Sequence, residues 1–191
     1  MTGDEQIGFD FGVDVAERTA WETWVDSKRR AAQIRKLLGR AGLPALPSEP
    51  WDFESDNAIQ VSEVIAELFP DMESVTLPAN ADRIDQLACF IGEWFVRYLD
   101  AQWVDLAKHK DTPAGYNDYD GFSFYNGIKP AVAFGFAGWK TCTAELLVKY
   151  VVETEFLNIV DLVAPAYWKL RKEDGSFADL RRNLPDHPPF L

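Results

Sequence analysis

Histidine and cysteine are scarce in this sequence, and their scarcity excludes several kinds of site. The 191 residues include two histidines, His109 and His187, and two cysteines, Cys89 and Cys142. A zinc site needs clustered His and Cys ligands, and no such cluster occurs. The cysteines have apolar or small neighbours, which favours two buried, reduced thiols, although a single disulfide between them is compatible with their spacing. We therefore expect no metal and no cofactor.

Motifs that hold phosphates or activate nucleophiles are also missing. The sequence has no G-x-G-x-x-G loop and no G-x-S-x-G elbow, and GFAGWKT places Trp139 where a Walker A loop requires glycine. A catalytic triad could still assemble in space around His109. These gaps favour a protein without enzymatic activity, and an unrecognised enzyme stays the alternative.

Long apolar runs and a basic N-terminus are absent too. No run reaches the ~18 residues of a membrane span, and MTGDEQIGFDFGVD has neither the basic nor the apolar region of a signal peptide. We expect a cytoplasmic protein. The formal net charge is −12, with 31 acidic and 19 basic residues. Such a surface repels nucleic acid and anionic membranes and attracts basic proteins, although it also serves solubility alone.

Apolar residues, by contrast, make up 47% of the sequence and aromatic residues 14%. Their spacing of three and four is typical of helices with one buried face. We expect a single α+β domain over residues 1–191, with N-terminal helices, a small, mostly antiparallel sheet and a closing helix. Its parts are a helical segment (1–80), a helix–sheet–helix core (81–165) and a proline-rich tail (183–191). The predicted helices span residues 14–38, 57–69, 81–99, 143–163 and 176–182, with a strand at 101–107 and an extended piece at 74–78.

Local charges and caps accompany these helices. Asp14 and Glu17 fit a capping box at the start of the first helix, and its basic stretch SKRRAAQIRK lies where the helix dipole favours cations. This basic stretch therefore does not require a nucleic-acid partner. In the third helix Glu93 and Arg97 are four residues apart, which predicts an exposed ion pair. Pro165 is expected to end the closing helix.

The stretch AGYNDYDGFSFYNG, residues 114–127, is the strongest candidate for a turn or a site. Asn126-Gly127 predicts a two-residue hairpin turn that pairs Tyr125 with Ile128, with a bulge or an edge near Pro130. A calcium loop is excluded, because Tyr116 and Gly127 would occupy the two positions that need the strongest ligands.

The loop before this turn is the predicted partner-binding surface. Tyrosine rings beside carboxylates supply rigid, amphipathic contact area, and the residues that we expect to contact a partner are Tyr116, Asp118, Tyr119 and Asp120. The alternative is a solvated turn in which Asn and Asp bond the local backbone.

Two other classes of function stay open. A small-molecule site would use an aromatic pocket between the sheet and the third helix, lined by Trp94, Trp103 and Tyr125. A structural subunit would expose an apolar face on the first helix around Trp21 and Val25.

The region from Ile84 to about Val163 resembles a group of small, uncharacterised bacterial α+β proteins. The matching residues are Gly92-Glu93, Trp103, Gly127, Pro130 and Lys149, and the insertion KHKDTPAGYNDYD departs from the pattern. Some proteins of this kind are thought to be immunity proteins that neutralise a toxin. The resemblance implies a non-enzymatic, antitoxin-like inhibitor of a basic partner protein and assigns no catalytic residue.

Overall fold

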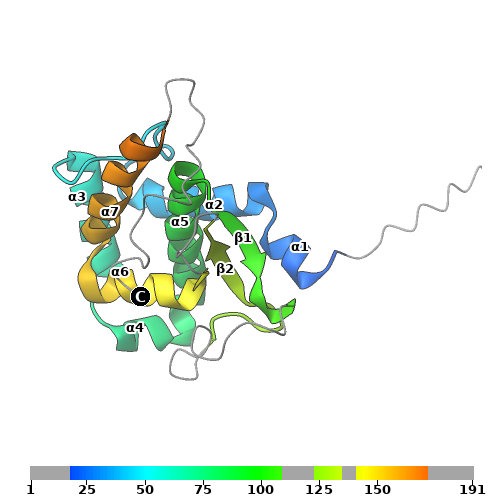
Figure 1. Cartoon of the computed structure of the whole chain (residues 1–191). Coiled ribbons are helices and arrows are strands. Elements are labelled where there is room, and N and C mark those ends of the chain that lie inside the picture. The colour runs from blue at the N-terminus through cyan, green and yellow to red at the C-terminus, as the bar shows by residue number, and fades with distance from the viewer. Residues whose placement is uncertain (1–17, 109–122, 135–140, 172–191) are drawn as a thin grey trace, which may run out of the picture.

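The computed structural model describes residues 18–108, 123–134 and 141–171 (Figure 1). Among these residues, three short strands lie between a first group of helices and two closing helices, and this arrangement confirms the predicted α+β class. The helices are α1 (Ala20–Trp24), α2 (Ser27–Arg40), α3 (Asp56–Leu68), α4 (Met72–Thr76), the 3₁₀ helix η1 (Pro78–Asn80), α5 (Ala81–Leu99), the 3₁₀ helix η2 (Leu106–Lys108), α6 (Ala144–Thr154) and α7 (Phe156–Leu170). The strands are β1 (Gln102–Asp105), β2 (Pro130–Ala133) and β3 (Cys142–Thr143).

Helix α5 forms the centre of the core, and its predicted boundaries, 81–99, are confirmed. Thirteen of its 19 residues are buried, because α2, α6, α7 and the sheet all pack around it (Figure 1). The predicted apolar face is buried throughout, including Leu87, Ile91 and Phe95. A helix that is apolar around most of its circumference is stable only in such a central position.

The N-terminal helix differs from the prediction because the structure divides it. Thr19 caps α1 in a capping box with Glu22, so the helix does not run continuously from residue 14. A second cap follows at Asp26, whose carboxylate accepts hydrogen bonds from the N–H groups of Lys28 and Arg29. The residues of the Asp14–Glu17 box lie outside the described residues.

Ion pairs hold α2 against α5. Arg29 pairs with Asp85 and Arg30 with Glu93, and Lys36 contacts Asp82 at the surface. Three of the basic residues of α2 therefore form ion pairs within the molecule. The predicted Glu93–Arg97 pair was wrong, because the carboxylate of Glu93 is bound by α2.

The sheet has the order β1-β2-β3 and is antiparallel. The predicted hairpin was wrong: Trp103 of β1 lies opposite Val132 of β2, so β2 pairs with β1 and β3, and the described residues 123–125 form no strand beside it. Gly127 does adopt a positive φ of 75°, as expected for a turn. Pro130 starts β2, which is a position where a missing N–H is tolerated.

The segment that follows α3 also differs from the prediction. Residues 74–78 were predicted as extended, but Ser74 to Thr76 belong to α4, which Asp71 caps through the N–H of Ser74. Helix α3 is confirmed within one residue at each end. Its buried face contains Val61 and Ile65, whereas Ile59 is exposed.

The predicted closing helix is two helices. Residues 146–153, which could have formed a strand, are helical within α6. Glu155 separates α6 from α7 with a φ of 75°. Pro165 lies inside α7 and does not end it, so that prediction was wrong. Pro165 and Asp161 are exposed, so water can satisfy the carbonyl that proline leaves unbonded.

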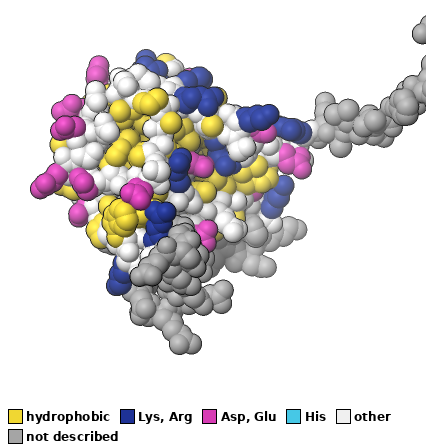
Figure 2. Space-filling view, turned by 90° about the horizontal axis from the view of Figure 1, so that it is seen from above, with side chains coloured by type: hydrophobic (Ala, Val, Ile, Leu, Met, Phe, Trp, Pro, Cys, Tyr) yellow, Lys and Arg dark blue, Asp and Glu magenta, His cyan; other side chains and the backbone are white. Residues whose placement is uncertain are grey.

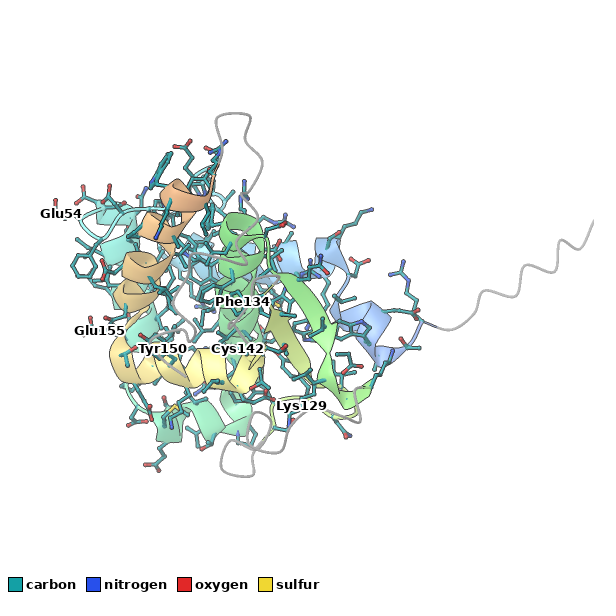
Figure 3. The ribbon with its side chains drawn as sticks, viewed as in Figure 1. Glu54, Lys129, Phe134, Cys142, Tyr150 and Glu155 are labelled. Carbon is teal, nitrogen blue, oxygen red and sulfur yellow. The ribbon has the colours of Figure 1, made fainter. Side chains whose placement is uncertain are left out.

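The two cysteines are free and buried, as expected. Figure 3 labels Cys142, which lies in the interior beside α6. Within the described part of the chain, every helix is too short or too polar to cross a bilayer.

Candidate functional site

The buried carboxylate of Asp85 is the main polar feature of the interior. It lies on the face of α5 toward α1 and α2 and is 7% exposed. Its Oδ1 accepts hydrogen bonds from Trp24 Nε1 and from the hydroxyl of Tyr125, each at 3.1 Å. Its Oδ2 accepts from Arg29 Nη2 at 2.5 Å and from the amide of Gln33. Each oxygen thus has two donors, so Asp85 has no free lone pair for a ligand.

The groups around Asp85 titrate far from neutrality. Burial raises the pKa of Tyr125 well above its ordinary value, and the charge of Asp85 adds to this effect. Burial alone would lower the pKa of Arg29, but its hydrogen bond to Asp85 and the charge of that carboxylate outweigh burial and raise it. Tyr125 is therefore a neutral donor and Arg29 a permanent cation at physiological pH. This arrangement joins α1, α2, α5 and residues 123–125, and we interpret it as structural.

The three residues of the predicted aromatic pocket separate into two clusters. Trp103 and Tyr125 both contact Trp24, with ring centroids 4.9 Å and 5.4 Å apart. Trp94 instead packs in the core against Trp51 at 5.0 Å and Phe156 at 5.3 Å. The interior between α5 and β1 is filled, because the Trp103 ring covers the backbone of Gly92.

A cavity of about 200 Å³ does lie beside Tyr125. Its walls are residues 75–78, the first turn of α5 and residues 123–125. Asp85 and Tyr125 border it, but their polar atoms already bond each other. Only Tyr125 of the three predicted pocket residues thus lines this cavity. Few polar groups in its walls are free to form hydrogen bonds that would orient a ligand.

Sequence reasoning did not single out Glu145, another buried carboxylate. It is 2% exposed, and its Oε1 accepts from the N–H of Phe124 at 3.1 Å and from the hydroxyl of Ser123 at 3.4 Å. Its Oε2 has no hydrogen-bond partner among the described residues. A lone Glu in the first turn of a helix is an ordinary feature, so no sequence signal distinguished it.

Residues 41–82 form an acidic surface that composition alone had not located. This segment contains nine acidic residues and neither Lys nor Arg, and all nine are exposed. Figure 2 shows Asp and Glu gathered on the side of α3, whereas Lys and Arg lie mostly over α1 and α2. Glu54 and Glu155 lie at the same outer edge in Figure 3. The acidic residues are Glu49, Asp52, Glu54, Asp56, Glu63, Glu67, Asp71, Glu73 and Asp82.

The predicted partner-binding residues, Tyr116, Asp118, Tyr119 and Asp120, lie outside the described residues, as do both histidines. Within the described ranges no group of three His, Cys, Asp or Glu side chains is arranged to hold a metal ion. Comparisons with protein-family models, with curated proteins and with solved structures found no match.

Proposed function

We propose that this protein is a non-enzymatic binding module that recognises a basic protein, in the manner of an immunity protein or antitoxin. The observation that carries the proposal is the acidic surface of residues 41–82. It contributes nine negative charges without a single cation, in a chain whose formal net charge is −12. A surface of one sign steers a partner of the opposite sign and accelerates association.

Most of these acidic residues form no ion pair with the described part of the molecule. Glu49 pairs with Arg171 and Asp82 with Lys36, but the other seven form no ion pair with any described residue. Glu63 and Glu67 are four apart on α3, an arrangement of like charges that costs a helix about 0.2–0.5 kcal/mol. Helix stability therefore does not explain the Glu63–Glu67 pair, whereas recognition of a cation does.

Exposed apolar side chains accompany the acidic residues. Phe53 is 50% exposed, Ile59 38% and Leu77 49%, and all three belong to residues 41–82. Trp168, 55% exposed, is on α7, which packs against α3. Interfaces combine a few large apolar side chains with a polar rim, so this composition suits a protein better than a small cation.

The test is capture of a partner from lysate of the source cell at low and at high salt. We expect one basic protein that is retained at low salt and weakened at high salt. The variant Glu63→Gln/Glu67→Gln should retain less of it, without loss of stability, because it removes a repulsive pair. If the wild-type protein retains no stoichiometric partner at either salt concentration, the proposal is contradicted.

The alternative of a small-molecule-binding protein or unrecognised enzyme has less support at the predicted place. Trp94 lies in a different cluster from Trp103 and Tyr125, and Asp85 has no free lone pair.

The alternative of a structural subunit requires an exposed apolar face on the first helix, and the exposed apolar area there is limited. Trp21 and Val25 are half-buried against the core.

A further inference from the structure

A second cavity, of about 180 Å³, lies between α2, the connection at residues 45–46 and α5. Its apolar surface comes from Ala31, Ile34, Ala45 and Leu46. It is distinct from the cavity beside Tyr125, and none of its lining residues is one of the nine acidic residues of the segment 41–82. In an engineered apolar site, a cavity of roughly 150 Å³ admits benzene, so this one is large enough for a small ring or a branched chain.

Two arginines border this cavity without a carboxylate partner. Arg35 comes from α2 and Arg97 from α5, and neither forms an ion pair with any residue that the structure describes. The chain has 31 acidic and 19 basic residues. Two guanidinium groups without an ion-pair partner beside one cavity are therefore unexpected in a chain that is acidic overall.

Glu93 also borders the cavity, but its charge is already neutralised. Its Oε2 accepts from Arg30 Nε at 3.3 Å and from Trp103 Nε1 at 3.4 Å. The side chain of Arg30 is 12% exposed and that of Glu93 is 25% exposed, so this pair is partly shielded from bulk water. Glu93 is thereby withdrawn from Arg97, and the guanidinium group stays available to a ligand.

We propose that this cavity binds a small carboxylic acid with an apolar body, of about the size of benzoate. The guanidinium group presents paired donors that match a carboxylate, and Arg35 and Arg97 approach from two different helices. The apolar body of the ligand would cover Ala31, Ile34 and Leu46. This inference does not depend on the proposed protein partner, because none of the residues that line the cavity is one of the nine acidic residues of the segment 41–82.

The experiment is a titration of the ¹⁵N-labelled full chain followed by NMR, with three probes. Benzoate has the charge and the ring, benzamide has the ring without the charge, and acetate has the charge without the ring. We expect saturable shifts at Ala31, Ile34 and Leu46 with benzoate, and at least tenfold weaker binding of the other two. Equal binding of benzamide, or no saturable shift with benzoate, would overturn the proposal.

Two variants of equal charge give the matched control. Arg35→Gln/Arg97→Gln removes the two cavity cations, and Arg40→Gln/Arg83→Gln removes one exposed cation from each of the same helices. Losing both guanidinium contacts should weaken benzoate binding by roughly tenfold or more, whereas the control should bind like the wild type. Equal weakening in both variants would show general electrostatic attraction and would contradict a site.

Discussion

Gly92 lets a large side chain from the sheet approach the central helix. A Cβ atom at this position would lie 2.0 Å from Cη2 of Trp103, so no side chain fits there. The ring is held on its other sides by Trp24, at 4.9 Å between centroids, and by the carboxylate of Glu93. Gly92, Glu93 and Trp103 thus pack together, and each of them has a structural role.

We predict that Gly92→Ala lowers the free energy of unfolding by about 1–3 kcal/mol, because the added methyl group overpacks the contact with Trp103. Alanine is otherwise the better helix former by ~1 kcal/mol. The control is Gly39→Ala in α2, where no atom lies within 4 Å of the new Cβ, and it should stabilise the protein by up to about 1 kcal/mol. Urea unfolding measures both. Stabilisation by Gly92→Ala would show that Trp103 is free to move.

The buried thiols predict a loss of stability at alkaline pH. Burial raises the pKa of Cys89 and of Cys142 from 9.0 to about 12. Between these values the unfolded chain releases protons that the folded chain keeps. The stabilising contribution of the two buried thiols is therefore fully present below pH 9. It falls as the pH rises above 9, by about 1.4 kcal/mol per pH unit for each thiol. Unfolding free energies at pH 8, 10 and 11 would measure this slope.

The control for this slope is Cys89→Ala/Cys142→Ala. The variant is less stable at every pH, but its stability should fall less steeply between pH 9 and pH 11. The slope that remains above pH 10 comes from Tyr98 and Tyr125, whose pKa values burial also raises. Parallel pH profiles for the wild type and the variant would rule out buried thiols as the cause.

Among the helices and strands, the sequence predicted those features that depend on the local spacing of apolar residues. Residues 81–99 repeat apolar side chains so regularly that the central helix was identified with its boundaries. The hairpin failed because the turn signal at Asn126-Gly127 is local, whereas strand pairing is decided by distant residues of β1 and β3. The carboxylates of Asp85 and Glu145 were missed for the same reason. Their partners lie 21 to 61 residues away in the chain.

The junction of α6 and α7 illustrates a conformation that sequence pattern does not reveal. Glu155 has φ 75° and ψ 151°, a region occupied almost only by glycine. We predict that Glu155→Gly stabilises the protein by about 1 kcal/mol, because it relieves this strain. The matched variant Glu153→Gly, within α6, should destabilise it by about 1 kcal/mol. Thermal unfolding distinguishes the two, and destabilisation by Glu155→Gly would show that its side chain is needed at this junction.

At the scale of the whole molecule, charge is separated between helices that the chain joins directly. Lys and Arg gather on α2, and half of them pair with acids of α5. The segment that follows α2 has acidic residues and neither Lys nor Arg, and the acidic residues of α3 face outward (Figure 2). The net charge indicated an acidic protein, but only the structure shows which face carries the unpaired charge.

The association rate of the captured partner as a function of salt shows which acidic segment faces that partner. Three chains would be compared: the wild type, Glu63→Gln/Glu67→Gln on α3, and Asp118→Asn/Asp120→Asn in the segment after η2. Each double variant removes two negative charges, so the comparison isolates position from net charge. If α3 faces the partner, its variant associates more slowly and with a weaker salt dependence than the other two chains. An unchanged rate for the α3 variant would contradict the proposal that the acidic residues of α3 face the partner.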